Sequence, residues 1–308
     1  MKLLNTSFSI VFVGLFLFPV SAKSQSPVGF DFLRTQVGAR PSAMAGAFIA
    51  IPGDIHNLVY NPAGLSAITK RQGTASYLNH LLDFQSGFFA YAQPIAQGTG
   101  AVAVNFFDFG QFERSDVNNV VTGEFGANSL VFSVSYSQEV VQNLSLGGSA
   151  KFIRFQIDDL NETALAADIG LMFTIPDEDL NFGVGVFNVG TTTSAFIDTK
   201  DDLPLSVQVG ASKTLEHLPL LISASLVKVK EDDLRFRLGG EITFTEQFFG
   251  RLGYNSVGQD QKVNTGKDRL AGVSAGLGFK VGKFNVDYSF SSFGEIGSLN
   301  RVTLIGQF

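Results

Sequence analysis

The stretch LRFRLGGEITFT, residues 234–245, decides the fold because its side chains alternate between two kinds. One parity is apolar, whereas the other carries Arg235, Arg237 and Glu241. Successive side chains of a β-strand point to opposite faces, so the stretch predicts a strand with one apolar and one charged face. Such a strand needs an apolar environment on one side and a polar environment on the other.

The same alternation recurs from residue 71 to residue 308. It divides into about fourteen segments of about nine to eleven residues, the length of a tilted strand that spans a membrane. Closed bacterial barrels have an even number of strands. The pattern therefore predicts an all-β chain that folds as a closed antiparallel transmembrane β-barrel.

The links between these segments have a rhythm of their own. Every other link is short, such as PDED at 176–179 and VGK at 281–283, whereas several of the others are long and polar, such as 108–127 and 255–269. Short periplasmic turns that alternate with longer outer loops are typical of outer-membrane barrels. This layout predicts a protein of the outer membrane of a Gram-negative bacterium, with both chain ends at the periplasmic side.

The charged parity is expected to face the barrel lumen. An arginine at the lipid midplane costs about 2–4 kcal/mol, so charges gathered on one face of a strand should point inward. The residues expected to face the lumen are Asp168, Arg235, Arg237, Glu241 and Asp287. The alternative is a soluble β-sandwich, which has the same parity but does not usually need so many long strands.

The two ends of the chain carry signals of another kind. Residues 1–24 are typical of a secretory signal peptide, because Lys2 precedes an apolar run that ends in small residues. Residues 25–70 do not alternate, and we expect them to fold back as a plug, since the lumen of so large a barrel is too wide for its own side chains to fill. A flexible periplasmic tail is the alternative. The terminal Phe308 is expected to be the signal that the barrel-assembly machinery reads.

The composition argues against several classes of function. The chain has no cysteine, three histidines that are far apart in sequence and a net charge of −6, so thiol chemistry, a paired-histidine metal site and a nucleic-acid partner are not expected. We predict no enzyme activity and no cofactor, because a lone loop histidine such as His80, near Asp83, is usually only solvated. The acidic pairs at 158–159, 201–202 and 232–233 are either solvated loop charges or sites for divalent cations.

The segment before the barrel carries a block of short motifs. These are Phe32-Leu33, Gly38-Ala39-Arg40, Met44-Ala45-Gly46-Ala47, Ile49-Ala50, Asp54 and Tyr60-Asn61-Pro62-Ala63-Gly64-Leu65. The block resembles the N-terminus of the PorV/PorQ family, fourteen-stranded outer-membrane barrels similar to the fatty-acid transporter FadL. The chain departs from that family at Met44-Ala45-Gly46, where Met-Gly-Gly is common, and at Gly53-Asp54, where Asp-Asp is common.

The resemblance implies a non-enzymatic component of the type IX secretion system. Such a barrel binds or shuttles cargo with a C-terminal sorting domain, or anchors the attachment complex, and its other partners are outer-membrane lipid and lipopolysaccharide. The alternative is a FadL-like transporter for hydrophobic small molecules such as long-chain fatty acids. The resemblance also marks Arg40, Asp54, Asn61, Pro62 and Gly64 as plug residues.

Two of these plug features carry a geometric expectation. Arg40 should pair with a luminal carboxylate such as Asp168, Glu241 or Asp287, because an unpaired buried guanidinium would be costly. Asn61 and Pro62 should form a tight turn that leads from the plug into the first strand.

Overall fold

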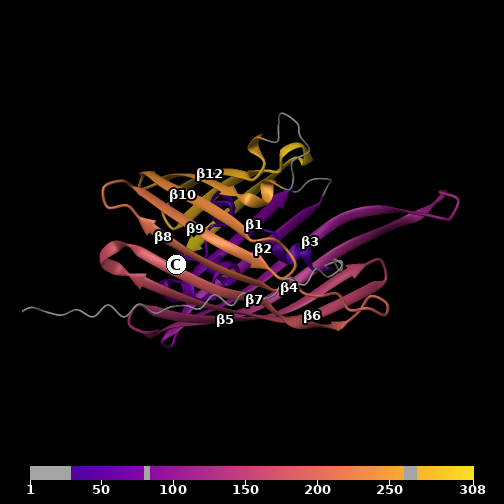
Figure 1. Cartoon of the computed structure of the whole chain (residues 1–308), viewed down its shortest axis with the longest axis horizontal. Helices are drawn as coiled ribbons and strands as arrows, with labels where there is room; N and C mark the ends of the chain where they lie inside the picture. The colour runs from indigo at the N-terminus through magenta and orange to yellow at the C-terminus, as the bar shows by residue number, and fades with distance from the viewer. Residues whose placement is uncertain (1–28, 80–83, 260–268) are drawn as a thin grey trace, which may run out of the picture.

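The computed structural model describes residues 29–79, 84–259 and 269–308. The predicted signal peptide at 1–24 and the neighbours His80 and Asp83 lie outside the described residues. Within these ranges, fourteen strands form one closed antiparallel barrel (Figure 1), which confirms the predicted fold class. Among the described helices, none is long and apolar enough to cross a membrane, a finding that concerns helices only.

Each strand pairs with its neighbours in the chain. The strands are β1 (Gln72–Asn79), β2 (Gln85–Ile95), β3 (Gly98–Ser115), β4 (Val121–Val141), β5 (Leu144–Ile157), β6 (Leu160–Ile175), β7 (Leu180–Ser194), β8 (Ser206–Thr214), β9 (Leu220–Val229), β10 (Arg235–Thr245), β11 (Phe248–Asn255), β12 (Val273–Val281), β13 (Phe284–Ser292) and β14 (Ser298–Gln307). The helices are η1 (Asp31–Arg34), α1 (Ala39–Ala43), α2 (Asn57–Tyr60), η2 (Pro62–Ala67), η3 (Pro176–Glu178), η4 (Ser256–Gln259) and η6 (Gly294–Ile296).

The first and last strands close the barrel. β1 pairs with β14 along its whole length, from Gln72 opposite Gln307 to Asn79 opposite Asn300. Closure leaves no open sheet edge within the barrel wall, which is the condition for strands in hydrocarbon, where water cannot satisfy backbone groups. The ring of Phe308 packs edge-on against that of Phe284, with 6.1 Å between centroids.

The alternation in sequence corresponds to outside and inside. On β10, Leu238 is 49 % exposed on the outer face, whereas Glu241 on the other face is 7 % exposed. Asp168 and Asp287 are likewise buried on the inner side of their strands. The outer face of the barrel is thus an apolar belt, and the inner face carries hydroxyl groups and charges.

Strand lengths differ from the predicted nine to eleven residues. β1 and β11 have 8 residues, whereas β3 has 18 and β4 has 21. The polar stretch at 108–127, expected to be a loop, is largely a continued β3–β4 ladder whose connection spans only 116–120. Strands can form there despite the polar residues, because beyond the membrane water can contact both faces of a hairpin.

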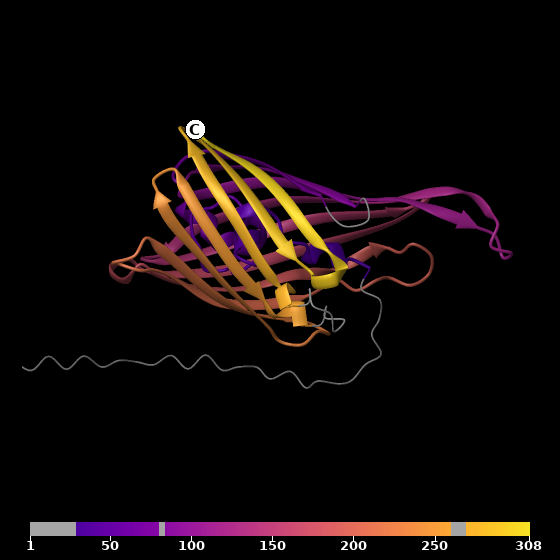
Figure 2. The same ribbon diagram turned by 90° about the horizontal axis from the view of Figure 1, so that it is seen from above.

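Residues 29–71 lie inside the ring of strands, and we call them the luminal segment (Figure 2). At one end of the barrel, Arg34 forms an ion pair with Asp232 in the β9–β10 link. At the other end, Phe308 donates its backbone N–H to the carbonyl of Arg71. Gly29, the first described residue, and Phe308 thus lie at opposite ends of the barrel, and the expectation that both chain ends are periplasmic stays a prediction. The luminal segment runs the length of the lumen before β1 begins, and counting strands could not reveal this.

The apolar belt gives a prediction about single charges. Leu238→Arg places a guanidinium near the middle of the outer face of β10, so it should lower the free energy of unfolding by about 2–4 kcal/mol. Leu234→Arg, just before the start of the same strand, should cost only about 0–1 kcal/mol. Denaturant unfolding in lipid vesicles measures both, and equal costs would contradict an outer face covered by hydrocarbon.

Candidate functional site

The luminal segment packs against the inner wall through several clusters of apolar side chains. Toward β1–β3 and β14, Ile55, Leu58 and Leu65 form a cluster with Phe88 and Ile305. Nearer the longer links, the second cluster consists of Phe30 and Phe32 with Phe107, Val131, Ile153, Ala164, Ala166 and Leu203. Ile49 and Ala50 also contact Phe187 of β7, and these apolar contacts fix the position of the segment together with polar ones.

A chain of alternating charges joins the segment to three strands. Arg40 donates to both oxygens of Glu241, from Nε at 2.8 Å and from Nη2 at 2.6 Å, and its Nη1 lies 3.0 Å from Asp54 Oδ2. Glu241 also accepts from Arg251 Nε at 2.5 Å, and Arg251 Nη1 lies 2.5 Å from Asp287 Oδ1. Of the three luminal carboxylates that the sequence analysis offers as partners of Arg40, the structure pairs Arg40 with Glu241.

Asp54 connects this chain to a buried histidine. Its Oδ1 accepts the backbone N–H of His56 at 2.9 Å and lies 2.7 Å from His56 Nδ1. Arg40 and the backbone N–H of His56 both stabilise an ionised Asp54 carboxylate, which in turn holds Arg40 in place. The turn that contains Asp54 precedes α2, and His56, the N-cap residue of α2, makes no capping hydrogen bond with its side chain.

Asn61 holds the segment to itself and to the wall. Its Nδ2 donates to the carbonyls of Ile49 at 2.7 Å and Leu171 at 3.1 Å, and its Oδ1 accepts from Ala63 N at 3.1 Å. Pro62 begins the helix η2, so the expected tight turn directly before the first strand is wrong: β1 starts only at Gln72. The proline fits there because the first position of a helix needs no N–H donor.

Two glycines of the barrel wall leave space for the motif of Asn61 and Pro62, and we call this place the glycine seat. A Cβ on Gly147 of β5 would lie 2.3 Å from the carbonyl carbon of Pro62, and one on Gly170 of β6 would lie 2.0 Å from Asn61 Oδ1. Gly147 and Gly170 are cross-strand neighbours. The segment's backbone therefore lies directly on a patch of wall without side chains.

The remaining predicted inner residue, Asp168, belongs to a separate group. Lys151 Nζ lies 2.6 Å from Asp168 Oδ2, and Asp168 Oδ1 accepts from the backbone N–H of Asn188 at 2.8 Å. Asn188 lies in a bulge of β7 with a positive φ of 58°, and its Nδ2 donates to the carbonyl of Pro204. This group stiffens the wall beside a cavity.

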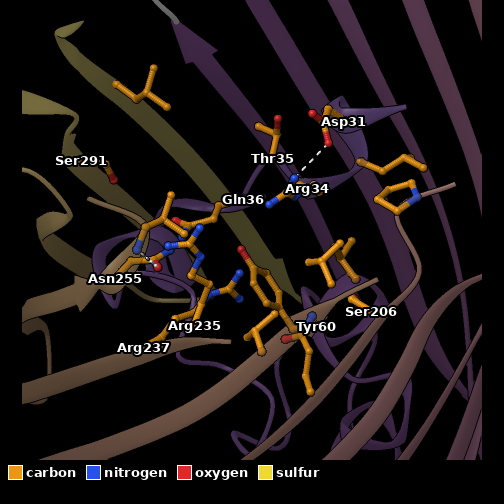
Figure 3. A pocket seen from close by; sticks show the side chains of 18 of the residues that line it. Asp31, Arg34, Thr35, Gln36, Tyr60, Ser206, Arg235, Arg237, Asn255 and Ser291 are labelled. Atoms are coloured by element: carbon orange, nitrogen blue, oxygen red, sulfur yellow. Dashed lines mark hydrogen bonds and ion pairs between the residues drawn. The ribbon is translucent and has the colours of Figure 1, made fainter. Parts of the chain in front are cut away.

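A cavity of about 510 Å³ lies between the luminal segment and strands β7–β14. Its apolar lining includes Leu33, Val59, Phe187, Val227, Val257 and Leu299. Its charged lining consists of Asp31, Arg34, Lys151, Arg235, Arg237 and Arg301, and Figure 3 shows Arg235 and Arg237 on one side of it near Tyr60. The cavity thus combines apolar walls with a gathering of cations.

Two of these arginines have no carboxylate partner among the described residues. Arg301, 3 % exposed, donates from Nη2 to the carbonyl of Gln36 at 2.5 Å and from Nη1 to the hydroxyl of Ser42. Arg237 donates from Nη1 to the carbonyl of Gly46 at 3.3 Å, and its buried Nε has no hydrogen-bond partner. Both guanidinium groups face neutral acceptors of the luminal segment and border the cavity.

Sequence reasoning placed Arg235 and Arg237 on the inner face but did not single out Arg251 or Arg301. The signal was present, because Arg251 and Arg301 each precede an outward apolar residue of β11 and β14. Their partners come from distant strands, which strand parity alone cannot identify.

The fold and the cavity define a fourteen-stranded transmembrane β-barrel with an occupied lumen. No family model and no curated protein matches the chain. Among solved structures it is similar to the toluene transporter TbuX of Ralstonia pickettii, with a TM-score of 0.59, 13 % identity and coverage of 88 % of this chain and 98 % of that one. The toluene transporter TodX of Pseudomonas putida (TM-score 0.59, 11 % identity, 87 % and 96 % covered) and the monoaromatic hydrocarbon channel CymD (0.59, 11 %, 88 % and 97 %) share the fold as well. At these identities the likeness shows the fold alone.

The ion pairs of Arg40 predict a large effect on stability. Arg40→Ala leaves Asp54 without its guanidinium partner and Glu241 with Arg251 alone, so the barrel should lose about 3–5 kcal/mol, the range for a broken buried ion pair. Loss of heat resistance, followed as a shift in gel mobility, measures it. Arg154→Ala on the outer rim, where the side chain bonds only to exposed amides, should change stability by less than about 0.5 kcal/mol. Equal heat resistance of wild type and Arg40→Ala would show that the pairing is not needed.

The glycine seat predicts a difference between adjacent positions of β5. Gly147→Ala drives a methyl group into the backbone at Pro62 and should displace η2, so proteases should reach residues 57–67 faster. Gly148→Ala is the matched control, because its Cβ meets only the carbonyl oxygen of Asp168 at 3.7 Å. Identical digestion patterns for the two variants would refute the seat.

Proposed function

We propose that this chain is a non-enzymatic outer-membrane channel for small amphipathic acids, with long-chain fatty acids as the model substrate. The observation that carries the proposal is the luminal cavity, in which apolar walls meet the guanidinium groups of Arg237 and Arg301. The closed barrel with its apolar belt supports a place in the outer membrane of a Gram-negative bacterium, with the short turns at the periplasmic side.

The two arginines favour a substrate with an acidic group. Guanidinium groups bind carboxylates in a bidentate way, and a charge taken out of water gains most from a partner of opposite charge. The neutral carbonyls of Gln36 and Gly46 now occupy part of their hydrogen-bonding capacity. A carboxylate at this place would meet both cations, and its hydrocarbon chain would contact the apolar lining.

The structural neighbours support a transport role of this general kind. TbuX and TodX are toluene transporters, and CymD is a monoaromatic hydrocarbon channel. Toluene carries no charge, whereas the cavity of this chain borders five cationic side chains and one carboxylate. We therefore assign this barrel to a related form of transport with a different substrate.

The role in type IX secretion stays a prediction from the N-terminal motifs. Arg40, Asp54 and Asn61, which carry much of that resemblance, hold the luminal segment together and fix it to the wall. Any barrel that keeps a segment in its lumen needs such contacts, so they do not favour secretion over transport. Deleting the gene tests the secretion role, which predicts surface proteins trapped in the periplasm.

The transport proposal is tested by uptake. Liposomes that contain the mature barrel should take up radiolabelled dodecanoate faster than empty liposomes, and excess unlabelled dodecanoate should compete. The same rate with and without protein, or competition by dodecane equal to that by dodecanoate, would overturn the proposal.

The two arginines predict which ligands should bind less tightly to variants of this protein. Arg237→Met and Arg301→Met should each weaken binding of dodecanoate about tenfold or more, since a hydrogen bond to a charged group contributes about 1.5–3 kcal/mol. Binding of dodecanol, which has the same chain but no charge, should change much less. Calorimetry on the detergent-solubilised barrel measures both, and equal losses for the two ligands would remove the arginines from head-group recognition.

A further inference from the structure

The β3–β4 hairpin extends well beyond the rest of the barrel wall (Figures 1 and 2). The ladder between β2 and β3 ends where Gln85 meets Asp108, and the ladder between β4 and β5 ends where Ala127 meets Ile157. Beyond these points residues 111–115 and 121–126 pair only with each other among the described residues. We call these two stretches the projecting ribbon.

The ribbon is an ordered piece of sheet. A bulge between Asp108 and Gln111 contains Gly110 at a φ of 82° and separates the ribbon from the wall. At the tip, Asp116 Oδ1 accepts the backbone N–H groups of Asn118 at 2.8 Å and Val120 at 2.9 Å. These two backbone hydrogen bonds lower the pKa of Asp116, so the tip turn keeps its charge and its shape.

The two faces of the ribbon differ in chemistry. On one face Phe112 stacks on Phe125 with 5.5 Å between ring centroids, and the guanidinium of Arg114 lies over Phe125. On the other face Glu113 lies directly opposite Glu124, and both are exposed. Like charges directly opposite each other destabilise a strand pair, and among the described residues no cationic side chain forms an ion pair with either glutamate.

The outer edges of the ribbon are open as well. A strand edge presents unpaired N–H and C=O groups that accept a further strand, and a two-stranded ribbon alone is only marginally stable in water. At its base, Asp158 N–H donates to the carbonyl of Gly126, which covers the start of one edge. The remaining edge groups have no strand beside them in the part of the chain that the structure describes.

We propose that the projecting ribbon is a docking site for an extended, basic protein segment, which adds to it as a third strand and places lysine or arginine side chains beside Glu113 and Glu124. Such a strand would satisfy the open backbone groups and neutralise the paired glutamates together. Its alternate side chains would reach the face of Phe112 and Phe125.

Charge decides between this partner and the other candidates. Pairing of two copies through corresponding edges would bring four glutamates to one face, because each copy contributes Glu113 and Glu124. An anionic lipid surface is repelled by the same carboxylates, and lipid offers no backbone to complete a sheet. A basic extended segment is the partner that both neutralises the glutamates and completes the open edge of the sheet. The site lies apart from the luminal cavity and does not depend on the transport proposal.

The test uses the full mature barrel in detergent micelles and a synthetic probe, the acetylated and amidated peptide Thr-Lys-Val-Lys-Val-Thr. Its lysines share one face when the peptide is extended. Hydrogen exchange followed by mass spectrometry should show several-fold slower exchange of residues 109–127 with the probe present. A control peptide with glutamate in place of lysine should leave their exchange unchanged.

A charge-reversed variant sharpens the test. In the double variant Glu113→Lys and Glu124→Lys the preference should invert, so that the glutamate peptide slows exchange and the lysine peptide does not. The substitutions are on exposed positions and keep the backbone edges, so the barrel itself should remain heat-resistant. Absence of slowing by the lysine peptide, equal slowing by both peptides, or equal slowing by lipopolysaccharide with magnesium would each overturn the proposal.

Discussion

The structure depends on the requirement that every backbone N–H and C=O group in hydrocarbon has a protein partner. Pairing of β1 with β14 meets it by closing the sheet. Closure with fourteen strands produces a lumen that inward side chains alone cannot fill. The luminal segment occupies that space, and its own polar groups then need partners on the inner wall. The charges and hydroxyl groups of the inward parity supply them, so one constraint accounts for both faces of each strand.

The interior is held by polar contacts at defined places more than by a continuous apolar core. Arg40 and Glu241 join the segment to β10, Asn61 joins it to β6, and Arg301 joins it to β14. Between these points lies the cavity, where Arg237 and Arg301 already donate to carbonyls of the segment. The groups that position the segment and the groups that line the cavity are therefore partly the same. A molecule that binds there meets a prearranged charge and does not need to create it.

Much of this architecture could be read from the sequence, and the limits of that reading have physical causes. A period of two is local, so it revealed the number of strands and the inward direction of Glu241 and Asp287. The pattern could not show where a ladder of paired strands ends, because a hairpin such as residues 109–126 can form in water as well as in lipid. It could not show that the segment passes along the lumen from Gly29 to Arg71, and it left three candidate partners for Arg40. The path of the segment and the pairing of Arg40 are set by contacts between residues more than a hundred positions apart.

The contacts of β14 have a consequence for the order of folding. Thr303 accepts the backbone N–H of Ala39, and Arg301 holds Gln36 and Ser42, across 259 to 265 residues of chain. These bonds cannot form until the last strand has been made and has met the first. Contacts of such high sequence separation are slow to form, because the loop entropy is lost before the contact is gained. The segment therefore reaches its final position only when the barrel closes, and a partly assembled barrel holds it without the contacts of β14.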